Sequence, residues 1–145
     1  MTIHRMDHVS VVVDDLEAAV AFFVDLGLEL EGQAPIEGAH VDRLNALDGM
    51  RVAIAMMRTP EGDGRLELTK FHAPAAVVPE PKDALGNVLG LRSIMFNVDD
   101  VDATLAGLRA HGAELIGQVE QYGDSYRLCY VRGPAGIIVA LAQEL

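Results

Sequence analysis

A segment near the start of the chain recurs further along, and this repeat constrains the fold more than any other feature of the sequence. In each copy an apolar, β-branched run leads into a pair of aspartates, a stretch with apolar residues at helical spacing, and a glycine. Three aligned pairs keep the same offset of 85 positions: Asp14 with Asp99, Asp15 with Asp100, and Gly27 with Gly112. Such a repeat indicates a duplicated module.

A second shared motif, R-x-P-x-G, precedes the last apolar run of each copy. It occurs at 58–62, before Leu66-Glu67-Leu68, and at 132–136, before Val139-Ala140-Leu141. With the first motif it predicts the element order βαβββ in each copy. We therefore expect an α+β fold with a first module at residues 1–72, a linker at 73–89 and a second module at 90–145. Three prolines between positions 74 and 81 are typical of a linker.

The hydrophobic pattern places the elements within each module. We expect Asp14 to cap a first helix that begins at Asp15 and ends at Gly27. In the fourth strand, alternation sends Leu66 and Leu68 to one face and Glu67 to the other. The remaining expectations are strands at 8–13, 28–34, 50–57, 65–71, 91–98, 114–121, 126–131 and 137–142, a helical turn at 41–47 and a second helix at 101–111.

Composition and charge exclude several classes of function. Half of the 145 residues are hydrophobic, but no apolar stretch approaches the roughly 20 residues that a membrane span needs. The formal net charge of −11 opposes binding to nucleic acid or to an anionic membrane surface. Cys129 is the only cysteine, so neither a disulfide nor a cysteine zinc site is expected. Without a signal pattern at the N-terminus, we expect a cytoplasmic protein.

The chain resembles the vicinal oxygen chelate superfamily, which includes glyoxalase I, bleomycin-resistance proteins, extradiol dioxygenases and methylmalonyl-CoA epimerase. The resemblance rests on Asp7-His8-Val9 opening a strand, on the two Asp-Asp pairs, and on Arg132-x-Pro-x-Gly before the last strand. It implies that two βαβββ modules form a cleft of curled sheet that takes a small-molecule ligand. It also implies a homodimer.

The same resemblance implies a metal site, and this chain departs from it. Metal-using members take ligands from the first and last strands of both modules. His8 and Glu67 match two of these positions, but Ser93 and Ala140 stand at the other two. Two ligands would hold a divalent ion such as nickel, zinc, manganese or iron weakly, so a site without metal is the alternative.

His8 and Glu67 are also candidates for catalysis without metal, because a carboxylate beside an imidazole forms an acid–base pair. Glu67 lies in an apolar strand, and a buried carboxylate needs a partner. The sequence leaves open whether that partner is His8, Arg92 or Arg127. The expected substrate-binding residues are Ser93, Ala140, Arg92, Tyr126 and Arg127.

Two classes of function stay open at this point. One is an enzyme that acts on a small oxygenated metabolite by lyase, isomerase or dioxygenase chemistry, with Glu67 or His8 as the base. The other is a metal-free protein that sequesters a small compound, as bleomycin-resistance proteins do. The missing ligands disfavour glyoxalase I activity.

Overall fold

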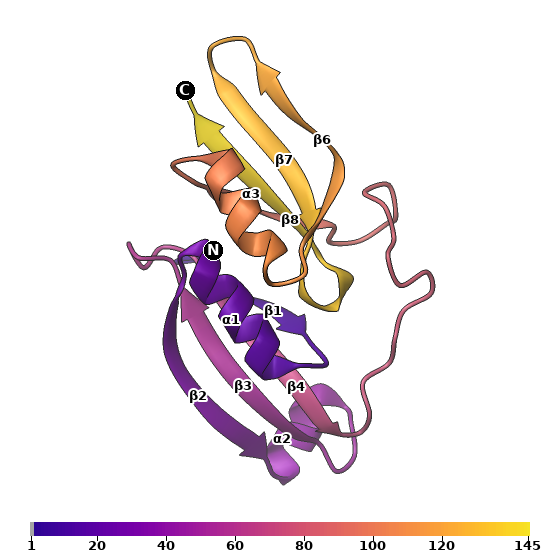
Figure 1. Cartoon of the computed structure of the whole chain (residues 1–145). Coiled ribbons are helices and arrows are strands. Elements are labelled where there is room, and N and C mark those ends of the chain that lie inside the picture. The colour runs from indigo at the N-terminus through magenta and orange to yellow at the C-terminus, as the bar shows by residue number, and fades with distance from the viewer. Residues whose placement is uncertain (1) are drawn as a thin grey trace. The chain divides into compact units, whose positions relative to one another are not determined.

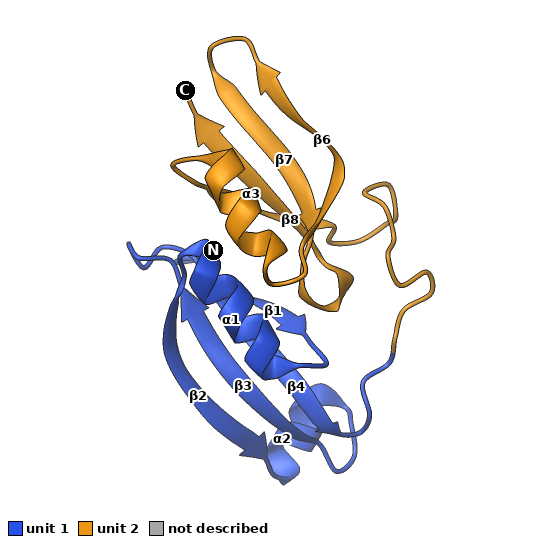
Figure 2. Cartoon of the chain, viewed as in Figure 1, with its two compact units in different colours: residues 1–77 blue, residues 78–145 orange. Residues whose placement is uncertain are grey.

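The computed structural model describes residues 2–145, and the chain divides into two compact units, residues 1–77 and 78–145 (Figure 2). Each unit holds a four-stranded mixed sheet and at least one helix in the order βαβββ. The predicted α+β fold of two modules is therefore confirmed. Among the described residues, no helix combines the length and the apolar character that crossing a membrane requires.

The first unit places helix α1 on one face of its sheet (Figure 1). Its strand order is β1-β4-β3-β2, with β1 parallel to β4 and the other pairs antiparallel. Phe22 and Phe23 of α1 are buried, and their rings meet edge to face with centroids 5.1 Å apart. The elements are β1 (Val9–Val12), α1 (Leu16–Leu26), β2 (Glu29–Glu37), α2 (Ala39–Asn45), β3 (Arg51–Arg58) and β4 (Arg65–Ala73).

The second unit repeats this topology with the strand order β5-β8-β7-β6, and α3 packs on β7 and β8. Val101, Leu105 and Leu108 are the buried side chains of α3. The elements are β5 (Ser93–Asn97), α3 (Val101–Arg109), β6 (Glu114–Tyr122), β7 (Tyr126–Arg132), the 3₁₀ turn η1 (Pro134–Gly136) and β8 (Ile138–Glu144).

The predicted cap of the first helix was wrong by one residue. Asp15, not Asp14, is the N-cap: its backbone is extended, and its carboxylate accepts a hydrogen bond of 3.0 Å from the amide of Ala18. Asp14 instead offers its backbone carbonyl to the Lys70 ammonium at 2.6 Å. Asp100 caps α3 in the same way as Asp15 caps α1, so the second aspartate of each pair has this role.

The face of the first sheet opposite α1, here called the first open face, carries the predicted polar side chains. Leu66 and Leu68 are buried on the other face, beneath α1, as the alternation predicted. A separate apolar cluster involving α2 includes part of the open face, with Val41, Met50 and Val52 buried at its centre. The sheet therefore keeps its polar residues near the start of β1 and β4.

The two sheets share one register, which identifies equivalent residues. Ser10 pairs with Glu67 across β1 and β4, and Met95 pairs with Ala140 across β5 and β8. Because Ser10 and Met95 are 85 positions apart, Ala140 occupies the place of Glu67 in the repeat.

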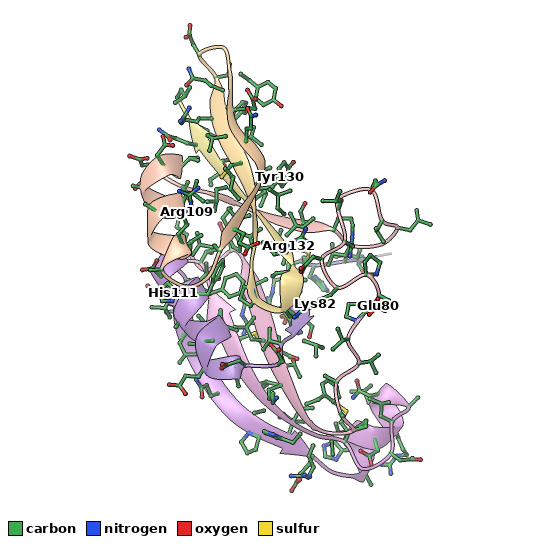
Figure 3. The ribbon with its side chains drawn as sticks, turned by 45° about the vertical axis from the view of Figure 1, so that its right-hand side comes forward. Glu80, Lys82, Arg109, His111, Tyr130 and Arg132 are labelled. Atoms are coloured by element: carbon green, nitrogen blue, oxygen red, sulfur yellow. The ribbon has the colours of Figure 1, made fainter. Side chains whose placement is uncertain are left out.

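Arg132, the first residue of the second R-x-P-x-G motif, holds the middle of the segment that connects β4 to β5. Its Nη1 donates hydrogen bonds to the carbonyls of Ala84, at 2.9 Å, and Gly136, at 3.0 Å. Figure 3 shows Arg132 near Lys82, which lies two residues before Ala84. The motif thus joins the middle of this connecting segment to the 3₁₀ turn.

Candidate functional site

The pairing of β1 with β4 brings His8 and Glu67 together. His8 directly precedes β1, and its Nε2 lies 3.4 Å from Oε2 of Glu67. The side chains are 31% and 23% exposed, so both reach solvent while resting on the sheet. Of the three partners that the sequence left open for Glu67, the structure provides His8.

Two hydroxyl groups orient the other oxygen of Glu67. Thr69 Oγ1 donates to Oε1 at 3.0 Å, and Ser10 Oγ donates to the same atom at 3.5 Å. Thr69 is buried and lies two residues from Glu67 on the same face of β4, so its hydroxyl holds the carboxylate from the side. As a result, Oε1 accepts hydrogen bonds from the protein's own hydroxyl groups, and Oε2 is directed at the imidazole.

Asp7 holds the opposite side of the imidazole ring. Its Oδ2 lies 2.7 Å from Nδ1 of His8, and its Oδ1 accepts a hydrogen bond of 3.2 Å from Arg5. Nη1 of Arg65 donates to Oδ2 at 3.3 Å. The bond with His8, then that with Arg5 and the charge of Arg65, lower the pKa of the Asp7 carboxyl below its ordinary value of 3.8.

Arg65 is itself anchored by Glu31 on β2. Two parallel hydrogen bonds join them: Nη2 to Oε1 at 2.7 Å and Nε to Oε2 at 3.2 Å. This bidentate pair raises the pKa of the guanidinium and fixes its plane. The polar network therefore runs from Glu31 through Arg65, Asp7 and His8 to Glu67.

In the second unit, the expected substrate-binding residues lie in different surroundings. Ser93 is exposed at the start of β5, whereas Ala140 is completely buried in β8. Arg127 donates two hydrogen bonds, of 2.9 and 3.0 Å, to Asp102 of α3, so it is engaged on the helix side of the sheet. The exposed Tyr126 pairs with Glu144, and Arg92 donates to the carbonyl of the preceding residue at 3.1 Å.

Comparison with known proteins identifies the family. The family model of the Glyoxalase/Bleomycin resistance protein/Dioxygenase superfamily matches residues 5–141. The chain belongs to this superfamily. A crystal structure of a glyoxalase family protein from Bacillus cereus is 46% identical, with a TM-score of 0.95 over 100% of this chain and 97% of that chain.

More distant relatives of the chain have other descriptions. The uncharacterized protein YaeR of Escherichia coli (strain K12) is 27% identical over 143 residues, which are 97% of this chain and 96% of that protein. TnmS3, an antibiotic binding protein from Streptomyces sp. CB03234, is 24% identical with a TM-score of 0.63, and the match covers 100% of this chain and 99% of that chain. TnmS3 shares the fold, and the superfamily supports several chemistries on that fold.

The residues present supply only part of a metal site of this superfamily. The 3.4 Å between His8 Nε2 and Glu67 Oε2 suits two ligands of one tetrahedral ion, whose bonds to nitrogen and oxygen are each about 2.1 Å. Catalytic zinc sites use three protein ligands, however. Residues 2–145 contain no group of three or more histidine, cysteine, aspartate or glutamate side chains placed to hold an ion. The donor set therefore falls short of a complete site.

Sequence reasoning did not assign roles to Asp7, Arg65, Ser10 or Thr69, although the structure places all four in the network. A signal for three of them was present. Arg65 and Thr69 share the face of Glu67 by strand alternation, and Ser10 lies two residues beyond His8. Asp7 could be found only from its position next to His8.

Proposed function

We propose that the first open face is the active site of an enzyme in which His8 and Glu67 transfer a proton on a small oxygenated metabolite. One observation carries this proposal. The duplicated sheet forms in the second unit with Ser93 and Ala140 in place of His8 and Glu67, so the fold does not require the ionisable pair. Its retention on one face supports a chemical role there.

The proposed reaction is an isomerisation by way of an enol. Glu67 takes a proton from the carbon next to a carbonyl group, and the electron pair of that C–H bond moves toward the carbonyl oxygen. The imidazolium of His8 donates its Nε2 proton to that oxygen. Glu67 then delivers that proton to the former carbonyl carbon of an α-hydroxy carbonyl substrate. His8 recovers a proton from the hydroxyl group on the carbon that was first deprotonated, so the C=O bond moves to that carbon. Ser10 and Thr69 support the base because they hold the other oxygen of Glu67.

Exchange of carbon-bound hydrogen tests this proposal. The full chain is incubated with hydroxyacetone in D₂O, and loss of its C–H signals is followed by proton NMR. We expect Glu67→Gln and His8→Gln each to slow the exchange about 100-fold or more, the usual contribution of a positioned acid or base. Glu17→Gln, an exposed change on α1, is the matched control. Unchanged exchange in a folded Glu67→Gln variant would remove the proposal.

Binding without chemistry is the second candidate, and the second unit supports it. Ala140 lies between Met95 and Tyr130 in the sheet, where the first unit has Glu67 between Ser10 and Met56. This change replaces a carboxylate by an apolar surface. The net charge of −11 would favour a cationic compound.

Calorimetry with bleomycin, the cationic antibiotic in the name of the superfamily, distinguishes the two candidate functions. A binding protein would retain its affinity in Glu67→Gln and would show no hydrogen exchange on the carbonyl probe. An enzyme would show exchange that depends on Glu67, whether or not it bound the antibiotic.

The homodimer, which the family resemblance supports, and the cytoplasmic location expected from the sequence also belong to the proposal. Light scattering on the purified full chain tests the first: a mass near twice 15.6 kDa is expected, and a mass of 15.6 kDa contradicts it. Fractionation of the source cells tests the second.

A further inference from the structure

We infer that Asp7 is a positioning residue, which fixes the tautomer of His8 with its hydrogen on Nδ1 and presents Nε2 to the substrate. This inference rests on the proposed function of the first open face. It adds a residue for which neither the superfamily match nor strand alternation gives a role. The Asp7–His8 contact, at 2.7 Å, is its starting point.

The two sides of the imidazole ring differ in their distance from a carboxylate. Asp7 lies at hydrogen-bond distance from Nδ1, while the 3.4 Å between Nε2 and Glu67 exceeds the usual 2.9–3.0 Å of an N–H···O bond. In the other tautomer, a lone pair on Nδ1 would face the carboxylate of Asp7. Because Asp7 is nearer to the ring than Glu67 is, this repulsion exceeds the repulsion between a lone pair on Nε2 and Glu67. The neutral ring therefore carries its hydrogen on Nδ1.

The surroundings of Asp7 keep its carboxylate in place. Arg5 bonds one oxygen, and Arg65 and His8 bond the other. Arg65 is in turn fixed by its bidentate pair with Glu31. An acceptor held by two guanidinium groups stays ionised, which is the state that accepts the Nδ1–H bond.

The duplicated unit provides an internal comparison. By the register of the two sheets, the places of Asp7, His8 and Arg65 are taken by Arg92, Ser93 and Ile138. The second unit thus lacks the imidazole, its orienting carboxylate and the arginine that holds that carboxylate. Asp7, His8 and Arg65 thus stand in the unit that has Glu67 and are replaced in the other unit. This is expected if Asp7 and Arg65 position His8 and are not needed for folding.

Nitrogen NMR of the full chain, labelled with ¹⁵N-histidine, tests the inference without substrate. His8→Gln identifies the His8 signals among the five histidines. In the pH range where the ring is neutral, the native protein should show a protonated Nδ1 and a bare Nε2. In Asp7→Ala the hydrogen should move to Nε2, because Glu67 still faces that atom, and Asp7→Glu should restore the native pattern at least in part.

Asp63→Asn removes the same charge from an exposed turn and should leave the His8 signals unchanged. A native ring with hydrogen on Nε2, or an Asp7→Ala ring still protonated on Nδ1, overturns the inference. If the native protein exchanges hydroxyacetone, Asp7→Ala should lower kcat about 10- to 100-fold with little change in KM. If tautomers respond as expected while the native protein shows no exchange, the proposed function fails and the positioning role stands.

Discussion

Glu67 and Ala140 occupy equivalent positions in the two halves of a duplicated fold, yet one is a solvent-accessible carboxylate and the other is completely buried. The residues opposite them have changed in parallel: Ser10 faces Glu67, and Met95 faces Ala140. One sheet has kept a polar site, and the other has kept an apolar packing surface at the same register.

This difference predicts opposite sensitivities to charge at the two positions. Ala140→Glu should lower the free energy of unfolding by about 3 kcal/mol or more, because it places an unpaired carboxylate in a buried site. Glu67→Gln should change it by less than about 1 kcal/mol, as expected for a partly exposed ion pair. Urea unfolding at pH 7 measures both, and an Ala140→Glu protein as stable as the native one would contradict the argument that a carboxylate at position 140 is buried and unpaired.

Metal binding should be weak and should depend on the His8–Glu67 pair. With two ligands, we expect that nickel, zinc, manganese and iron(II) each leave the protein during desalting, as elemental analysis would show. Any residual binding should disappear in His8→Ala, because alanine offers no donor atom to a metal ion. Near-stoichiometric metal in protein purified without a histidine tag would reveal ligands beyond these two residues.

The Arg127–Asp102 pair should make stability depend on acid pH. Its hydrogen bonds hold the pKa of Asp102 below the ordinary 3.8, so its contribution is complete above that pH and is lost as pH falls through the lowered pKa. Asp102→Asn should therefore be less stable than the native protein at pH 7, with a gap that narrows below about pH 3.8. Urea midpoints at pH 7, 5 and 3 test this, with Asp63→Asn as the control.

The last glycines of the two R-x-P-x-G motifs allow the contact between the 3₁₀ turn and the connecting segment to be tested separately from backbone strain. Gly62 and Gly136 have nearly the same φ, +81° and +78°, so alanine is strained at both by about 1–2 kcal/mol. Only at Gly136 would the added Cβ meet the chain, 3.0 Å from the Lys82 carbonyl oxygen. Gly136→Ala should therefore destabilise the protein more than Gly62→Ala does. Equal urea midpoints would show that the close contact between the new Cβ and the Lys82 carbonyl does not affect stability.

Arg132 should protect the connection from proteolysis. Without its bonds to the carbonyls of Ala84 and Asp83, the segment should open more often, and trypsin should cleave faster after Lys82. Arg132→Ala is compared with Arg58→Ala, which removes the corresponding arginine of the first motif and its bond to Glu29. Mass spectrometry of timed digests gives the rates, and equal rates would contradict the protective role.

The sequence was sufficient for the order βαβββ because the repeat constrains the shared elements twice. Asp15 and Asp100 cap equivalent helices, and the shared offset of 85 made the second strand–helix unit predictable from the first. Strand alternation also separated Glu67 from Leu66. The cap was misplaced by one residue because either aspartate of the pair satisfies the same composition rule, and backbone geometry decides between them.

The candidate site was only partly predictable, for a physical reason. Its contacts join residues that are distant in sequence, such as Arg65 with Glu31, and the partner of a long charged side chain depends on sheet order and register. Arg127 shows the same effect: the sequence allowed either a ligand contact or an ion pair with an acidic residue, and its position in β7 directs it toward Asp102.

The attachment of Ala84 to Arg132 has a consequence for protein engineering. A polypeptide divided at the unit boundary, between Val77 and Val78, would leave this fastening wholly within the later fragment. Each fragment would then contain a complete sheet, its helix and its own turn motif. The boundary is accordingly a rational place to split the protein for fragment complementation, or to exchange the order of its halves.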